Sequence, residues 1–342
     1  MSRVVRRITT SGHLHALCFC GALSALGCDP SGPPGDSQPP VDAGSPDSSL
    51  DAAPIVLVDL LAPVSADADQ LARDDSHLYW IQDGAVYRVD KTLDPGANPD
   101  LVIAPADAAA GLAVSDGQVY WSSRDQRTIS RGSVDGGAAE LVVAWAAPDG
   151  PALTLLVDET HVYWREEFAL ARADKNGGER ELLFTSGESI GTMTMSGDAL
   201  YFTTPGAGYE VHEIPKSGGP SSVAFGIIAL SSASVLGSAP GMVLQCGKDT
   251  VDPYRSLIAG YQGPSVPGEV LAIIPDVAMS VSGDNKYAYC AADTGIHRVP
   301  RSGGMVQMLA GGERIVSLVV DEQERLFWLD QGTLGLYRRL AQ

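Results

Sequence analysis

The stretch HVYWRE, residues 161–166, places a tryptophan directly after a tyrosine in a chain that has only five tryptophans among its 342 residues. Similar aromatic pairs recur in LYW (78–80), VYW (119–121), LYF (200–202) and LFW (326–328). When the second aromatic of each pair is taken as an anchor, the first spacings are 41, 43 and 38 residues and the last is 126. The last gap spans about three periods, so two further units are expected inside it.

Two weaker matches fill that gap. KYAYCAAD (286–293) aligns Tyr289 and Cys290 with the aromatic pair, and MVLQCGKD (242–249) aligns Gln245 and Cys246. The seven anchors are then Trp80, Trp121, Trp164, Phe202, Cys246, Cys290 and Trp328. A period of about 41 residues is the signature of a repeat architecture.

The third unit shows the internal order of one repeat. An apolar run (152–158) precedes HVYWRE, an alternating segment follows (169–174), and the turn KNGG (175–178) leads into RELLFTS (180–186). Four short strands in about 40 residues form one propeller blade. We therefore predict an all-β propeller of four-stranded blades over residues 55–342, with seven blades, or six if the unit around Cys246 is an insertion.

The two ends of this region predict how the ring closes. The last unit has one strand after Trp328 and then stops, so it lacks an outer strand. PIVLVDLLA (54–62) precedes the first complete unit and reads like the other outer strands. Because open sheet edges invite unwanted pairing, we expect residues 55–61 to complete the last blade.

Adjacent residues on a strand point to opposite faces, and both faces of a blade are covered by neighbours. Both aromatics of each pair should therefore be buried. Through LYWIQ, VYWSS, VYWRE, TISR (128–131) and GIHR (295–298), the repeat resembles YWTD-type propellers and related propellers of exported bacterial proteins. The resemblance covers residues 55–342 and implies the fold. YWTD propellers usually have six blades, and such folds include receptors, scaffolds and enzymes, so it leaves the function open.

The N-terminus has the features of an export signal. MSRVVRR is basic, and residues 14–27 are apolar but too short to span a bilayer. ALGC (25–28) resembles the lipobox of bacterial lipoproteins, which implies cleavage after residue 27 and lipid attachment to Cys28. Ordinary secretion, or a plain thiol at Cys28, remain alternatives. Residues 28–54 form a Pro-, Ser- and Asp-rich linker that should stay disordered and could reach roughly 80 Å when extended.

The charge excludes one class of partner. The chain has 23 Lys and Arg against 42 Asp and Glu, a net charge of −19, and no basic run. Such a surface repels nucleic acid and anionic lipid head groups. Any membrane contact is therefore expected through the lipid anchor alone.

The expected channel strands offer little catalytic chemistry. The innermost runs, 111–115, 153–157, 192–196, 278–282 and 315–320, carry Ser and Thr but no Asp, Glu or His. Propeller hydrolases and lyases usually place carboxylates there, often around calcium. We therefore expect no cofactor and no metal, although loops over the channel could supply ligands.

Several recurrent polar residues have a structural interpretation. Aspartates precede the aromatic pairs and are expected to form turns: Asp75, Asp116, Asp158, Asp284 and Asp321. Arginines recur near the ends of the third strands and are expected to pair with turn acids or carbonyls: Arg88, Arg131, Arg172, Arg298 and Arg338. His77 and His161 share one repeat position and His212 and His297 another, and each pair lies in different blades.

Cys246 and Cys290 could form a disulfide in an oxidising compartment. If both held the anchor position of adjacent blades they would point the same way from sheets about 10 Å apart, which is too far for the bond. Only a register slip in the poorly matched fifth unit would bring them together.

The loops between second and third strands vary most, and loops on a rigid scaffold often carry function. The candidate contact residues are Arg124, Asp125, Arg127, Glu166, Glu167, Lys248, Asp249 and Asp252. The sequence favours a noncatalytic, lipid-anchored propeller of the bacterial cell envelope that binds a protein, peptide or saccharide. A propeller-type hydrolase or lyase with a channel metal, and a structural envelope protein, are the alternatives.

Overall fold

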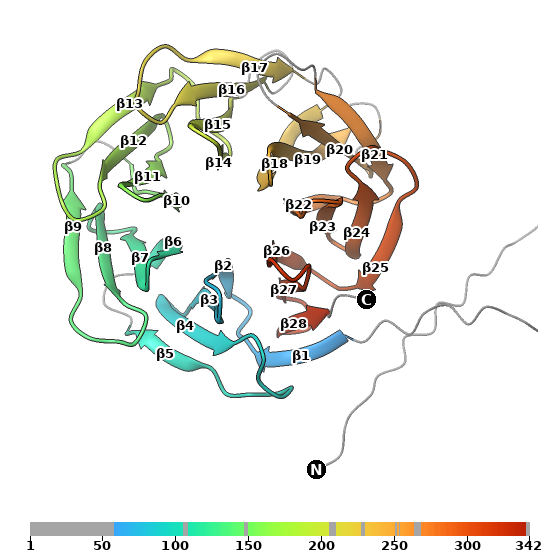
Figure 1. Ribbon diagram of the computed structural model, residues 1–342, viewed down its shortest axis with the longest axis horizontal. Helices are drawn as coiled ribbons and strands as arrows, with labels where there is room; N and C mark the ends of the chain where they lie inside the picture. Colours follow the sequence, from blue (N-terminus) through green and yellow to red (C-terminus); the bar gives the residue numbers. More distant parts are fainter. Residues whose placement is uncertain are drawn as a thin grey trace, which may run out of the picture. The chain divides into compact units, whose positions relative to one another are not determined.

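The computed structural model describes residues 58–104, 109–146, 150–204, 210–226, 230–249, 252, 254–262 and 268–339. Residues 54–342 form one compact unit. Cys28, the expected signal segment and the linker lie outside the described residues. The described strands form seven four-stranded antiparallel sheets arranged in a ring (Figure 1). The predicted all-β, seven-bladed propeller is confirmed.

The blades follow the chain in order. Blade 1 has β2 (Asp69–Arg73), β3 (His77–Gln82), β4 (Ala85–Asp90) and β5 (Asp100–Ile103), and blade 2 has β6 (Ala109–Ser115), β7 (Gln118–Ser123), β8 (Thr128–Ser133) and β9 (Glu140–Ala144). Blade 3 has β10 (Thr154–Val157), β11 (His161–Arg165), β12 (Ala169–Asp174) and β13 (Glu181–Thr185), and blade 4 has β14 (Met193–Ser196), β15 (Ala199–Thr204), β16 (Glu210–Pro215) and β17 (Ser222–Gly226).

The remaining blades close the ring. Blade 5 has β18 (Leu230–Ala239), β19 (Met242–Asp249), β20 (Ser256–Tyr261) and β21 (Glu269–Ile274), and blade 6 has β22 (Ala278–Gly283), β23 (Tyr287–Ala292), β24 (Gly295–Pro300) and β25 (Gln307–Gly311). Blade 7 has β26 (Ile315–Val320), β27 (Leu326–Asp330), β28 (Gly335–Arg339) and β1 (Val58–Pro63).

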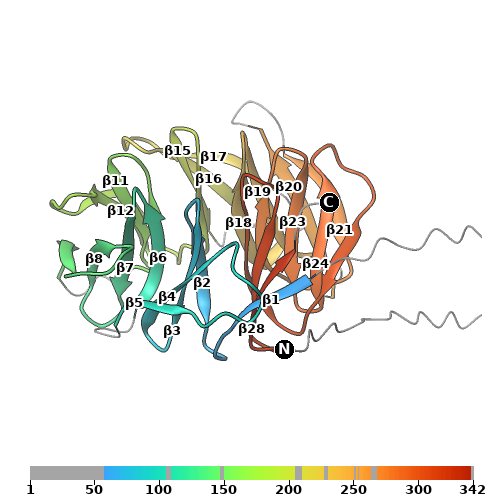
Figure 2. The same cartoon turned by 60° about the horizontal axis from the view of Figure 1, so that its bottom comes forward.

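The N-terminal strand completes the last blade as expected. β1 pairs antiparallel with β28, from Val58 opposite Arg339 to Pro63 opposite Gly335 (Figure 2). The described strand covers Val58–Pro63, and residues 55–57 of the expected 55–61 lie outside the described part. Ring closure thus joins segments from opposite ends of the unit.

The aromatic pair fills the contacts between blades. Trp164 packs in one apolar cluster with Tyr120 of blade 2, whereas its neighbour Tyr163 packs with Phe202 of blade 4. The anchor of each pair therefore faces the preceding blade, and the tyrosine faces the following one. Trp80, Trp164 and Tyr79 are fully buried.

The strand register corrects the alignment of blade 5. In blade 3, the anchor Trp164 pairs with Ala171, which pairs with Leu182 on the outer strand. The same path in blade 5 runs from Gln245 through Ala259 to Val270. Gln245, not Cys246, therefore holds the anchor position.

This shift of one residue explains a disulfide that the alignment disfavoured. Cys246 faces forward to blade 6, whereas Cys290, at the true anchor position, faces back to blade 5, and both belong to one buried cluster. Their Cα atoms lie 6.6 Å apart and the two sulfurs are bonded. The expectation that both cysteines point the same way was wrong, because the fifth unit was aligned one residue out of register.

The glycine pairs in the turns between third and fourth strands of blades 3 and 6 contact the outer strand of the preceding blade. Gly178 N–H donates to Val142 O of blade 2 (3.3 Å), and Gly304 N–H donates to Leu271 O of blade 5 (3.4 Å). Gly304 has φ +131°, a conformation that other residues rarely adopt. Each such turn satisfies an edge carbonyl of the preceding blade, which reduces the exposed edge.

Candidate functional site

The turns between first and second strands are organised by aspartates. The Asp158 carboxylate accepts hydrogen bonds from the amides of Thr160 and His161 (both 2.9 Å) and from the Tyr163 hydroxyl (2.9 Å). Burial alone would raise the pKa of Asp158, but these donors, with Lys216, hold it well below its usual value. Burial and the same hydrogen bond raise the pKa of Tyr163.

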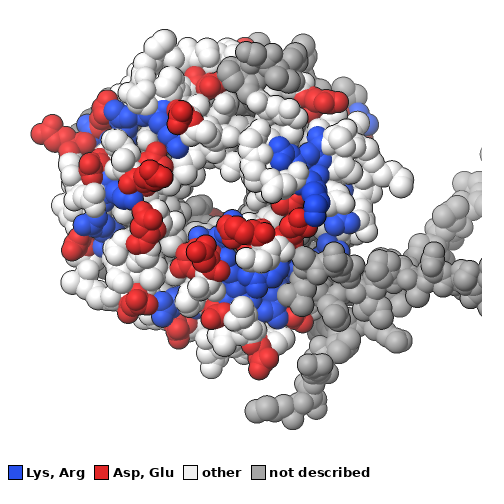
Figure 3. Space-filling view, viewed as in Figure 1, with Lys and Arg blue, Asp and Glu red and all other residues white. Residues whose placement is uncertain are grey.

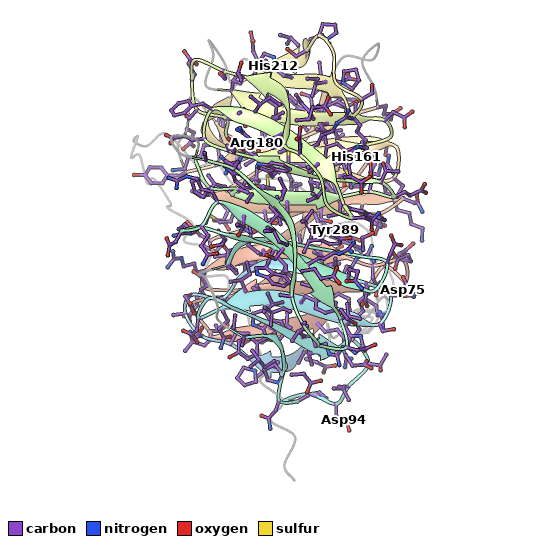
Figure 4. The ribbon with its side chains drawn as sticks, turned by 90° about the vertical axis from the view of Figure 1, so that its left-hand side faces the viewer. Asp75, Asp94, His161, Arg180, His212 and Tyr289 are labelled. Carbon is purple, nitrogen blue, oxygen red and sulfur yellow. A yellow bond between two sulfur atoms is a disulfide. The ribbon has the colours of Figure 1, made fainter. Side chains whose placement is uncertain are left out.

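The same arrangement occurs in blades 1 and 6. The Asp284 carboxylate accepts a hydrogen bond from the Tyr289 hydroxyl (2.6 Å), and the Asp74 carboxylate accepts one from the Tyr79 hydroxyl (2.6 Å). The prediction of Asp75 in this role was wrong: Asp75 is exposed, and its neighbour Asp74 lies five residues before the tyrosine, as in the other blades. Figure 4 shows Asp75 and His161 on the same face of the ring.

The other two aspartates act differently. Asp116 lies in a tight hairpin turn with φ +51°. Its carboxylate accepts a hydrogen bond from the Lys175 ammonium group of blade 3, with 2.6 Å between the nitrogen and the oxygen. Asp321 accepts the amides of Gln323 and Arg325 and pairs with the Arg325 side chain at 2.6 Å. All of these interactions fix turns, as the structural interpretation expected.

The recurrent arginines join each blade to the next. Arg131 pairs with Glu140 on its own outer strand at 2.8 Å, and its guanidinium also donates to Lys175 O of blade 3 at 3.1 Å. Arg172 makes the same two contacts with Glu181 and Lys216 O. We call this combination, an outer-strand acid plus a carbonyl of the next blade, the arginine clip.

Clips connect four consecutive junctions of the ring. Besides Arg131 and Arg172, Arg88 pairs with Asp100 and donates to Val134 O, and Arg338 pairs with Asp59 and donates to Lys91 O at 2.8 Å. Arg298 departs from the pattern: it stacks on Tyr287 at 4.3 Å and donates to Gln307. The clips are structural and occupy these arginines.

The histidines do not converge on one point. His77 and His161 are the first residues of β3 in blade 1 and β11 in blade 3, whereas His212 stacks on Phe202 at 5.2 Å. His297 is buried beside Asp276, with 3.5 Å between Nε2 and the carboxylate. Among the described residues, no three His, Cys, Asp or Glu side chains lie close enough together to hold a metal ion.

The channel is surrounded by the five inner strands that the sequence indicated, together with β2 and β18. β2 adds Asp69, whose pKa is raised by burial, and Arg73, which pairs with Glu322 at 2.6 Å. Figure 3 shows acidic side chains close to the central opening and basic ones further out on one face.

In the described part of the chain, no helix is long and apolar enough to cross a membrane.

The predicted contact loops are only partly a surface. Glu166 is 2% exposed, accepts the Trp164 indole N–H at 2.8 Å and pairs with Arg180 at 2.6 Å. Asp249 is buried in an ion pair with Arg255. Glu166 and Asp249 therefore stabilise their loops and are not available as contact residues.

The other candidates lie at or near the surface on turns between second and third strands. Arg124, Asp125 and Glu167 are exposed, and Lys248 is half-buried. Asp252 is also half-buried and accepts the Tyr254 amide at 3.0 Å. Arg127 adopts φ +54°. These residues lie on or directly beside the turns between second and third strands of blades 2, 3 and 5, on one face of the ring, with Lys248 near the end of β19.

Sequence reasoning missed three large apolar side chains on the same kind of turn. Phe168 is 48% exposed in blade 3, Tyr254 is 80% exposed in blade 5, and Leu334 is 46% exposed in blade 7. Leu334 also has φ +53°, where a branched residue is strained. Their signal was available: each is an isolated apolar residue inside a turn segment.

Comparisons with known proteins support the fold. No family model matches the chain, and no curated protein matches it. Among solved structures, a chain of a nidogen/laminin complex is 15% identical with a TM-score of 0.51, covering 76% of this chain and 91% of the other. The computationally designed protein Ika8 is 12% identical with a TM-score of 0.60, covering 83% and 100%. The extracellular domain of the B. thetaiotaomicron protein BT4673 is 10% identical with a TM-score of 0.61, covering 82% and 39%. At these identities the likeness establishes the propeller and leaves the function to the chain's own residues.

Proposed function

We propose that this protein is a noncatalytic interaction module, and that it binds a protein, peptide or saccharide through the turns between second and third strands. We call the surface formed by these turns the loop face. Exposed aromatic and aliphatic side chains on a rigid scaffold are typical of recognition surfaces. Phe168, Tyr254 and Leu334 give the loop face this character.

Leu334 is the observation that carries the proposal. When the last residue of a four-residue turn has left-handed backbone angles, Gly or Asn is favoured at that position. A leucine there destabilises the folded state by about 1 kcal/mol or more. Leu334 nevertheless occupies that position with its side chain 46% exposed. An exposed apolar residue that destabilises its own turn fits selection for contact with a partner.

The test uses one variant on each face. Tyr254→Ala removes the most exposed aromatic of the loop face, and Met305→Asp alters a residue that is 88% exposed on the opposite face. We expect an envelope ligand identified with the unaltered protein to bind Tyr254→Ala at least tenfold more weakly and Met305→Asp equally well, measured by calorimetry. Equal losses in both variants, or none in either, would reject the loop face.

We further propose that the chain is exported and anchored to a bacterial membrane through Cys28. The lipobox-like ALGC sequence motivates the anchor, and a disulfide between Cys246 and Cys290 is typical of oxidising compartments. Cys28→Ser should move the protein from the membrane to the soluble fraction and abolish incorporation of labelled palmitate. A variant that stays in the membrane fraction would refute lipid anchoring.

A further inference from the structure

One core position of the repeat changes chemistry in blade 7. It lies on the third strand of each blade, two residues after the residue that pairs with the anchor of the second strand. The residues at this position are Val89, Gly132, Ala173, Ile214, Tyr261, Val299 and Arg339. Val89, Ala173, Ile214, Tyr261 and Val299 are all buried in contacts between blades. Blade 7 thus places a guanidinium where the other blades place apolar or small residues.

Among the described residues, no carboxylate is paired with Arg339. Arg339 is only 7% exposed and pairs through its backbone with Leu326, which packs in a cluster with Tyr289 and Trp328. Within the described residues, its Nε atom has no hydrogen-bond partner. Burial, reinforced by the nearby charge of Arg298, lowers the pKa of Arg339. A guanidinium nevertheless stays protonated, and a buried charge without a counterion is strongly unfavourable.

Arg298 adds a second positive charge to the same seam between blades 6 and 7. In the clipped blades, an acid on the outer strand pairs with the equivalent arginine, but here the register partner is the neutral Gln307. In the clips the accepting carbonyl lies four residues beyond the residue that pairs with the anchor. The equivalent residue 341 of blade 7 lies outside the described residues. Among the described residues, Arg298 therefore has neither an outer-strand acid nor a clip carbonyl as its partner.

The acids of this seam already have partners. Asp284 accepts the Tyr289 hydroxyl at 2.6 Å, and Glu324 pairs with Lys286 at 2.7 Å. Neither carboxylate is paired with Arg298 or Arg339 among the described contacts. Figure 3 shows basic side chains gathered over this side of the ring.

We propose that the seam between blades 6 and 7 binds a small oxoanion, a phosphate or carboxylate group, between the guanidinium groups of Arg298 and Arg339. Arginine is the side chain best suited to hold such groups, because its planar fork can donate two parallel hydrogen bonds. The site lies away from the loop face, so it stands independently of the proposed function.

The test compares thermal unfolding of the purified chain in 10 mM inorganic phosphate, 10 mM acetate and chloride at matched ionic strength. We expect phosphate or acetate to raise Tm by about 2–4 °C, the shift for a ligand present at roughly tenfold its Kd. A larger shift with phosphate identifies a phosphate group as the natural ligand, and a larger shift with acetate identifies a carboxylate.

Arg339→Val makes the proposal falsifiable without unfolding the protein, because it restores the kind of residue found in the other blades. This variant should keep or raise Tm in chloride and lose the anion-dependent shift. Arg314→Gln, which removes an exposed charge elsewhere in blade 7, should keep the shift in full. The absence of any shift in the unaltered protein, or an equal shift in Arg339→Val, would overturn the site.

Discussion

Two parts of the ring are held together by different chemistry. From blade 7 through blades 1, 2 and 3, every junction carries an arginine clip to the following blade. In blades 4 and 5 the clip position holds Glu213 and Gly260, and the disulfide from Cys246 to Cys290 joins blades 5 and 6.

The difference shows which features of a repeat are needed at every blade. All seven blades keep the four-stranded sheet, so apolar packing between blades defines the fold. Polar connections vary, and a covalent bond occurs in the part of the ring where the arginines are absent. We infer that the chemistry of these connections is interchangeable and that packing suffices at some junctions, since among the described residues the junction between blades 4 and 5 carries neither a clip nor a disulfide.

The largest expected effect comes from removing the covalent connection. Replacing both cysteines, Cys246→Ala with Cys290→Ala, should lower the free energy of unfolding by about 4 kcal/mol, because the bond closes a loop of 44 residues. Urea unfolding measures the change. Amide exchange should accelerate first in β18–β25.

The control for that prediction is chemical reduction. A reductant should lower the urea midpoint of the unaltered protein to that of the double variant and leave the double variant unchanged. If reduction has no effect, the junction between blades 5 and 6 is held by packing alone, and the contrast between the two parts of the ring fails.

The aspartate–tyrosine turns occur in both parts of the ring, so they should matter equally in each. Asp158→Asn removes a carboxylate that accepts three hydrogen bonds and should cost about 2 kcal/mol at pH 7. Because folding lowers the pKa of Asp158, this contribution is present above about pH 4 and is lost as the pH falls toward the folded pKa.

The measurement is the urea midpoint at several pH values. The difference between the unaltered protein and Asp158→Asn should shrink steadily below pH 4. Asp116→Asn is the control, since Asp116 is exposed and binds no tyrosine, and it should leave the midpoint almost unchanged at every pH. A difference that grows with acidity would contradict the assigned direction of the pKa shift.

These residues also show what the sequence could and could not predict. The aromatic pairs predicted seven blades and the closing strand, because burial on both faces and a fixed period leave a strong signal. Strand register in blade 5 was not predictable, since Gln245 and Cys246 both lack the aromatic signal that fixes the anchor. A one-residue slip reverses the face of every side chain, and so the slip concealed the disulfide.

The candidate surface was harder to predict than the fold. Charge in a loop does not reveal whether the side chain is exposed, and Glu166 and Asp249 are buried by partners, Arg180 and Arg255, that lie 14 and 6 residues along the chain. Arg339 was overlooked for a related reason. Its unusual position becomes visible only when the third strands of all seven blades are aligned by register.

The clips themselves give a smaller effect. Arg172→Met removes a charged hydrogen bond to Lys216 O and should cost about 1.5 kcal/mol. Arg298→Met should cost less, because among the described residues Arg298 donates to the neutral Gln307 and to no carbonyl of the next blade. Urea midpoints compare the two variants, and an equal loss would mean that the carbonyl bond contributes little to a clip.

The smallest effect isolates the acid of the clip. Glu140 is 65% exposed in its pair with Arg131, so Glu140→Gln should cost about 0.5 kcal/mol or less and lose even that effect in high salt. Glu269 holds the same outer-strand position opposite Gly260, so Glu269→Gln should change nothing and serves as the control. If Glu140→Gln costs as much as the loss of a whole arginine, the clip is an ion pair within one blade. If its cost stays small while Arg172→Met remains costly, the carbonyl bond to the next blade is what links the blades, and the disulfide and the clips then serve one purpose in different parts of the ring.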